Sequence, residues 1–197
     1  MDTKTTLLVV FGAVVVIALL VGLSVMGMYN GLVNSDVTVD EKWAMVQTAY
    51  QRRADLIPQI VAVAQEYAEF EQGTLTAVTE ARASIGKAST PTELQAAGGA
   101  LDSALARLMV VVEAYPNLKA NENFLQLQSQ LEGTENRIKF ERDNYNTAVK
   151  DYQVRTRQFP TNMIAGMFGF MPDKHEMFQA TAGSEVAPDV KELFNRE

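Results

Sequence analysis

The sequence predicts an all-α protein: one N-terminal transmembrane helix followed by a bundle of three to four long antiparallel helices. Three observations support this fold class. An uncharged apolar run of 22 residues extends from Leu7 to Met28. Beyond it, apolar residues recur at steps of three and four over most of the chain, which is the period of an amphipathic helix. No segment alternates apolar and polar residues as a half-buried strand does.

The run from Leu7 to Met28 has the length of a membrane anchor. As a helix it spans about 33 Å, enough to cross a hydrocarbon core of about 30 Å. A signal peptide has a shorter apolar core and an Ala-x-Ala-like end, and no such end follows here. A buried core helix is usually interrupted by polar residues over this length, whereas this run holds only Ser24. We therefore expect residues 1–34 to form an anchor and its interface with the bilayer.

Charge and composition narrow the classes of function. Asp and Glu outnumber Lys and Arg by 24 to 17, and this net charge of −7 argues against nucleic acid as a partner. The chain has no Cys, so thiol nucleophiles and Cys-ligated metals are excluded. Its one histidine, His175, lies in a polar stretch that is typical of a solvated residue rather than a metal ligand. We expect no cofactor and no enzymatic activity.

Residues 35–160 are expected to form the helical bundle domain. A first apolar stripe runs from Val39 to Tyr50. Pro58 then interrupts it, because proline lacks an amide hydrogen and clashes with the preceding turn. This predicts either a kink or a joint between two nearly collinear helices. The next stripe, from Ile57 to Ile85, keeps its three-four step throughout and predicts one helix that ends near Gly86.

Two further helices complete the predicted bundle. Thr90–Glu93 matches a capping box with proline at the first helical position. Gly98–Gly99 inside this helix predicts a close helix crossing or a local break, since each glycine costs about 1 kcal/mol relative to alanine. After a turn at Tyr115–Asn117, the last helix begins between Asn117 and Asn121 and continues to Pro160.

Residues 161–197 differ from the bundle in their pattern of apolar and polar residues. Met163–Met171 is apolar but too short to cross a bilayer as a helix. It either packs back on the bundle, which we favour, or lies at the membrane interface. The end of the chain, from Asp173 to Glu197, is polar with short apolar anchors, and we expect it to be loosely held.

Four charged residues lie on the apolar stripes, where a bundle normally places leucine. They are Glu71, Arg82, Glu135 and Arg142. Because an unpaired buried charge is costly, these residues are expected to form a salt-bridge network across helices. The alternative is a pair of carboxylates with shifted pKa values that performs acid–base catalysis, and no motif supports it.

Several strings in the chain together resemble the LemA family of bacterial membrane proteins. They are Tyr29-Asn30-x-Leu32-Val33, Gln51-Arg52-Arg53-Ala54-Asp55-Leu56-Ile57-Pro58, Glu80-Ala81-Arg82-Ala83, the stretch from Glu113 to Phe124, the stretch from Leu131 to Ile138, Tyr145-Asn146, Phe159-Pro160-Thr161-Asn162 and Phe168-Gly169-Phe170. One departure is Gln59, where the family more often has asparagine. The resemblance implies an N-terminal membrane helix and a helical bundle, but no catalytic mechanism. Some members are linked to membrane zinc proteases, and a magnetosome membrane protein shares the domain.

These observations predict a non-catalytic, membrane-anchored scaffold or adaptor. Expected partners are the lipid bilayer, other copies of the chain, and other membrane proteins such as a membrane protease. The positive-inside rule weakly favours a single pass through the bacterial cytoplasmic membrane with the domain outside. A membrane-shaping protein and an enzyme that uses buried carboxylates are the alternatives. Expected contact residues are Tyr115, Pro116, Asn117, Lys119, Asn121, Met163, Met167, Phe168 and Phe170.

Overall fold

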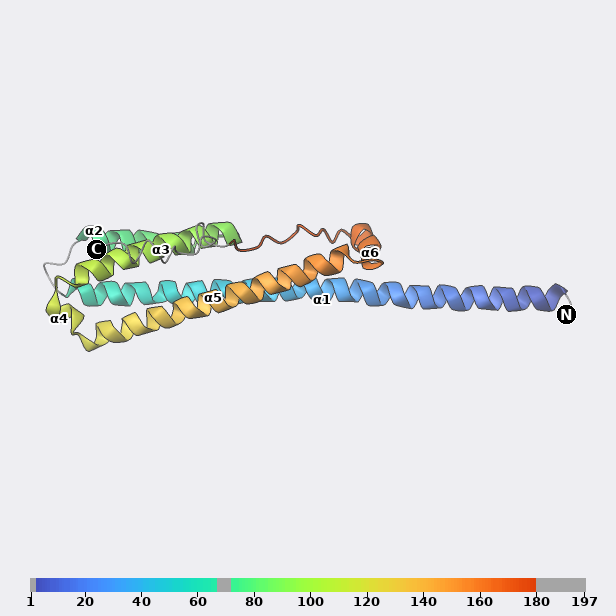
Figure 1. Cartoon of the computed structure of the whole chain (residues 1–197), viewed down its shortest axis with the longest axis horizontal. Coiled ribbons are helices and arrows are strands. Elements are labelled where there is room, and N and C mark those ends of the chain that lie inside the picture. The colour runs from blue at the N-terminus through green and yellow to red at the C-terminus, as the bar shows by residue number, and fades with distance from the viewer. Residues whose placement is uncertain (1–2, 67–71, 180–197) are drawn as a thin grey trace, which may run out of the picture.

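A computed structural model describes residues 3–66 and 72–179, and within these ranges every regular element is a helix. The helices are α1 (Thr3–Gln65), α2 (Gln72–Ile85), α3 (Pro91–Val112), α4 (Pro116–Lys119), α5 (Glu122–Arg157) and α6 (Thr161–Phe168). Helices α1, α2, α3 and α5 run up and down in alternation (Figure 1). The predicted all-α bundle with a long N-terminal apolar helix is confirmed.

Helix α1 joins the apolar run and the bundle in one element of 63 residues, about 95 Å long. The N-terminal end of α1, beyond α6, projects alone from the bundle (Figure 1), and its large apolar side chains are exposed. From Leu32 onward one face of the same helix is buried. Among the described residues, α1 and α3 are long and apolar enough to cross a membrane, but α3 packs into the bundle core. The predicted ends at Leu7 and Met28 therefore lie inside a longer helix.

Pro58 does not divide α1 into two helices, so the joint that was one of two alternatives is absent. Proline at this position leaves the carbonyl of Ala54 without its usual amide donor four residues later. The Arg82 side chain from α2 donates its Nε–H to that carbonyl oxygen at 2.9 Å. A side chain that is distant in the sequence, Arg82, thus replaces the helical hydrogen bond that Pro58 removes.

The single helix predicted from residue 57 to 86 is wrong. Helix α1 ends at Gln65 and α2 begins at Gln72, and α2 runs back along α1 (Figure 1). The apolar step of three and four continues through both helices, so periodicity alone did not reveal the reversal. Glu71, one of the predicted stripe charges, lies outside the described residues.

The start of α3 is as predicted. Thr90 caps the helix by accepting from the Glu93 amide, and the Glu93 carboxylate accepts from the Thr90 amide. Gly98 marks the predicted close crossing, because a Cβ there would lie 2.7 Å from the ring of Tyr50 on α1. Gly99 faces open space, and α3 runs through both glycines without a break.

The predicted turn at Tyr115–Asn117 contains the short helix α4, which shifts the start of α5 to Glu122. Asn121 is the N-cap of α5, and its side-chain oxygen accepts from the Phe124 amide at 3.1 Å. One hydrophobic core unites these helices, and its largest fully buried members include Tyr152, Phe124 and Leu118.

Part of the C-terminal segment that was expected to be loose is fastened to the bundle. Residues 169–179, here called the strap, run from α6 back along the bundle (Figure 1). Tyr145 donates its hydroxyl to the Glu176 carbonyl at 2.8 Å, and Asn146 holds both backbone groups of Phe178. The Phe178 ring is buried beside Trp43 and Tyr145. Residues 180–197 of the expected loose tail lie outside the described residues.

Candidate interaction surfaces

Arg53 is the centre of an ionic junction that joins three helices. Its side chain is only 9% exposed and lies 2.7 Å from Asp102 on α3. Its guanidinium also donates to Glu135 on α5, which receives a second, looser contact from Lys139 at 3.6 Å. Burial raises the pKa of Asp102, an effect that Arg53 opposes and Glu135 reinforces.

Glu135, Arg82 and Arg142, three of the charged residues on the predicted apolar stripes, lie apart and have different partners. Glu135 belongs to the Arg53 junction, and Arg82 binds the Ala54 carbonyl. Arg142 donates to the Gln95 side chain at 3.1 Å and lies over the Phe178 ring, 4.7 Å from its centroid. No ion pair joins any two of these three residues within the described part of the chain.

Sequence reasoning missed Arg53 and Asp102, although a signal for Arg53 was present. Arg53 follows Tyr50 by three residues and precedes Ile57 by four, so it continues the apolar stripe of α1. Its positive charge and the nearby Pro58 conceal this periodicity in the sequence. The Glu135 carboxylate, one of the predicted stripe charges, is thus paired with two cations, Arg53 and Lys139.

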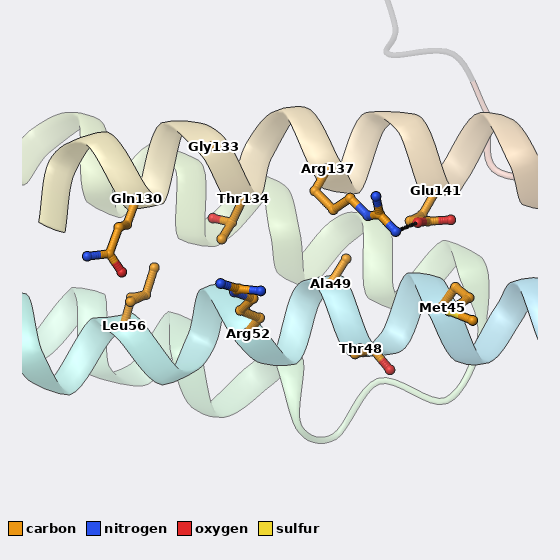
Figure 2. A pocket seen from close by; sticks show the side chains of 10 residues that line it. All are labelled: Met45, Thr48, Ala49, Arg52, Leu56, Gln130, Gly133, Thr134, Arg137 and Glu141. Atoms are coloured by element: carbon orange, nitrogen blue, oxygen red, sulfur yellow. Dashed lines mark ion pairs between the residues drawn. The ribbon is translucent and has the colours of Figure 1, made fainter. Parts of the chain in front are cut away.

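A groove of about 630 Å³ lies between α1 and α5, on the face turned away from the α2–α3 hairpin (Figure 2). Its lining residues are Met45, Thr48, Ala49, Arg52, Leu56, Gln130, Gly133, Thr134, Arg137 and Glu141. Across the helix pair Thr134 of α5 lies opposite Arg52 of α1, and Ala49 of α1 lies opposite Arg137 of α5 (Figure 2). All ten lining residues belong to α1 and α5, the two longest helices.

Only some of the charged side chains in this α1–α5 groove have an ion-pair partner. Arg137 pairs with the buried carboxylate of Glu141 at 2.6 Å, which the dashed line in Figure 2 marks. Arg52 points into the groove and has no hydrogen-bond or ion-pair partner among the residues that the structure describes. A groove of mixed polar and apolar lining that presents one free guanidinium fits a helix or extended segment that carries a carboxylate.

The two predicted contact regions lie at opposite ends of the bundle (Figure 1). At the end far from the apolar half of α1, Pro116, Asn117 and Lys119 are exposed, while Tyr115 is half-buried against the core. Lys119 forms an ion pair with Glu113, and Asn121 is used as the α5 cap. The tip therefore offers a small polar surface.

The other predicted region is helix α6 and the residues beside it. Tyr29 of α1 contacts the rings of Phe168 and Phe170, with centroids 4.9 and 5.9 Å away. Met163 and Met167 line a groove of about 500 Å³ against α1 residues between Ile17 and Met28. The stretch packs in part on the apolar run of α1, yet much of its apolar surface is uncovered, so the choice between the bundle and the membrane interface stays open.

The single histidine is not a solvated residue. The Nε2 atom of His175 lies 2.7 Å from Asp36 on α1, and its ring packs edge-on against Tyr152. Lys174 binds the same carboxylate at 2.6 Å. Burial alone would raise the pKa of Asp36, but the hydrogen bonds from Lys174 and His175 lower it below its usual value. In the described residues no three His, Asp or Glu side chains gather as metal ligands would.

Comparison with known proteins assigns a family to this architecture. The sequence profile of the LemA family matches residues 42–191. Magnetosome proteins MamQ 2 and MamQ 1 of Paramagnetospirillum magneticum are each 24% identical over 192 aligned residues, covering 84% of this chain and 70% of the relative. Protein LemA of Metamycoplasma hominis is 26% identical over 173 residues, covering 86% and 77%. These relatives and the apolar half of α1 are consistent with a membrane-associated protein. Since the profile spans most of its length, the chain belongs to the LemA family.

Proposed function

We propose that this protein is a membrane-anchored scaffold or adaptor that presents its helical bundle to other membrane proteins or to further copies of itself. The observation that carries this proposal is the continuity of α1. Because the anchor and the first core helix are one element, no flexible linker separates the bundle from the bilayer. The anchor and the bundle then move as one body, which suits a protein that positions partners.

The α1–α5 groove supplies a surface for such a partner. It lies between the two longest helices, its lining combines polar and apolar side chains, and Arg52 offers an unpaired positive charge. A partner helix with an acidic residue fits this chemistry. Relatives that are named as magnetosome proteins favour a role as one component of a larger assembly.

We further propose a single pass through the bacterial cytoplasmic membrane, with the bundle on the extracytoplasmic side. Few basic residues flank the anchor, so the positive-inside rule gives this orientation only a small bias. The absence of native cysteine makes the orientation easy to test, since a cysteine placed at exposed Lys119 would be the sole thiol. Labelling of Lys119→Cys by a membrane-impermeant maleimide on intact cells is expected, and labelling only after lysis would reverse the orientation.

Photo-cross-linking in the native membrane tests the scaffold function. A photoreactive amino acid at position 52 lies in the groove, whereas the same residue at exposed position 80 lies on α2, on the other side of the bundle. Discrete cross-linked products from position 52, and few from position 80, are expected. Detergent-free mass measurement of the extracted protein identifies whether the product is a second copy or another protein. Monomers alone, with no product from position 52, would overturn the proposal.

A further inference from the structure

Helix α6 and its flanks expose more apolar surface than water-facing structure normally carries. Within residues 159–171, Phe159 is 81% exposed, Met167 76%, Met163 65% and Met171 59%. Phe168 is also half-exposed, although one edge of its ring contacts Tyr29. The described part of the bundle elsewhere exposes its large apolar residues singly, whereas these five lie within thirteen consecutive positions. A contiguous apolar surface of this kind marks an interaction site.

The position of α6 identifies what covers this surface. Met163, Ile164 and Met167 line one groove with Leu20 and Met28, so α6 lies against the second half of the apolar run. That run is about 33 Å long as a helix, close to the thickness of a hydrocarbon core. If α1 spans the bilayer, an element that packs on residues 17–28 must lie at the depth of one leaflet.

Contact with lipid requires that backbone polar groups are bonded internally, and the backbone of this segment meets this requirement in part. Helix α6 forms its own helical bonds, and the Gly169 and Phe170 amides both donate to the Ala165 carbonyl, the second at 2.9 Å. Gly169 has a φ of 80°, the left-handed conformation that closes such a helix end.

Polar residues lie where the lipid headgroups would begin. Arg155 at the end of α5 donates to the Gly31 carbonyl at 3.1 Å, three residues beyond Met28. Arg157 pairs with Asp173 at 3.2 Å, just past the apolar stretch. Tyr29 lies between these charges and the anchor, and tyrosine is enriched at membrane interfaces. Arginines, an aromatic ring and then apolar side chains therefore follow one another toward the anchor.

We propose that residues 159–171 form an interfacial element whose exposed methionine and phenylalanine side chains enter the leaflet that α1 crosses. Its partner is the acyl-chain region of the lipid bilayer. The inference rests on the membrane anchoring in the proposed function and adds a second attachment point beside the first. With α6 held in the leaflet, the bundle cannot rotate freely about the axis of α1.

Nitroxide quenching in vesicles tests this placement on the full-length chain. Single cysteines replace Leu20 in the anchor, Met167 in α6 and Val110 on α3, and each carries the same environment-sensitive fluorophore. Val110 is 73% exposed, close to the 76% of Met167, so it controls for the apolar character of the label. The labelled proteins are inserted in phosphatidylcholine vesicles that contain phosphatidylcholine with a nitroxide on its acyl chain.

Quenching at position 167 is expected to approach that at position 20 and to exceed that at position 110 several-fold. Strong quenching at position 20 with none at position 167 overturns the interfacial element and leaves the anchor intact. A label at 167 that is shielded from water but not quenched by lipid would assign the surface to a second protein copy, which also overturns it. Absence of quenching at position 20 would refute the anchor and, with it, the proposed function.

Discussion

Arg82 compensates for a backbone hydrogen bond that Pro58 removes from another helix. Pro58 removes a hydrogen bond about two turns before the C-terminal end of α1, and helices normally bend or end at such a position. Here the freed carbonyl of Ala54 accepts from the Arg82 guanidinium, so α1 continues to Gln65. The charge of Arg82 on an apolar stripe is thereby explained without a carboxylate partner.

A double-mutant cycle tests this compensation. Arg82→Met is expected to lower the free energy of unfolding by about 1–3 kcal/mol, because it leaves a part-buried acceptor unsatisfied. In a Pro58→Ala background the amide of residue 58 is available to the Ala54 carbonyl, so Arg82→Met should cost clearly less. Thermal unfolding of the four proteins in detergent micelles, followed by circular dichroism, measures the coupling. Equal costs in both backgrounds would show that Arg82 acts in another way.

Adjacent glycines in α3 give a second test at the scale of single residues. Gly99→Ala is expected to stabilise the protein by about 0.5–1 kcal/mol, because alanine is the better helix former and the site faces open space. Gly98→Ala is expected to destabilise it, since the new methyl group would meet the buried Tyr50 ring at 2.7 Å. Denaturant unfolding of both variants compares them directly. Equal stabilisation would mean that Tyr50 moves aside freely.

Among the elements, the strap is the one whose attachment depends most on charge. Lys174 and His175 both bind the Asp36 carboxylate, and Phe178 packs on Trp43, the only tryptophan of the chain. The pKa of Asp36 is lowered in the folded protein, so its contribution is present above the ordinary aspartate pKa of about 3.9. That contribution is lost as the pH falls through the lower, folded value.

Asp36→Asn should therefore release the strap at neutral pH. The expected loss is about 1–2 kcal/mol, which raises the detached fraction roughly 5- to 30-fold. Trp43 fluorescence should shift to the red as Phe178 leaves, and the difference from the unaltered protein should vanish at pH values below the lowered Asp36 pKa. Asp40→Asn, at an exposed site one helical turn further along α1, is the matched control. A pH-independent difference would place the effect elsewhere.

Elements with strong local signals were the most predictable from sequence. The capping box at Thr90 and the apolar run of the anchor depend on neighbouring residues, so their structures were foreseen. The reversal between α1 and α2 could not be predicted, because the three-four spacing of apolar residues continues without a break from one helix to the next. The Arg53 junction also escaped prediction, since its partners Asp102 and Glu135 come close only after three helices pack.

For the whole molecule, the rod-like α1 predicts that the bundle stands away from the membrane. The helix continues from Met28 to Gln65, which is 37 residues and about 55 Å. A donor dye on Lys119→Cys at the α4 tip should transfer little energy to acceptor-labelled lipid headgroups. The same dye on Asn162→Cys in α6, also an exposed site, should transfer strongly. Equal transfer from both positions would show that the bundle lies flat on the bilayer.

A helix that is both anchor and core also acts as a lever. Membrane helices tilt by roughly 20° on average, and they tilt further when the bilayer is thinner than their apolar length. Because α1 has no joint at the membrane surface, a tilt of about 20° would carry the far tip of the bundle sideways by roughly 19 Å over an arm of about 55 Å. The local thickness of the bilayer would thereby set the sideways position of the bundle tip. A partner bound at the tip would then respond to bilayer thickness without contacting the membrane.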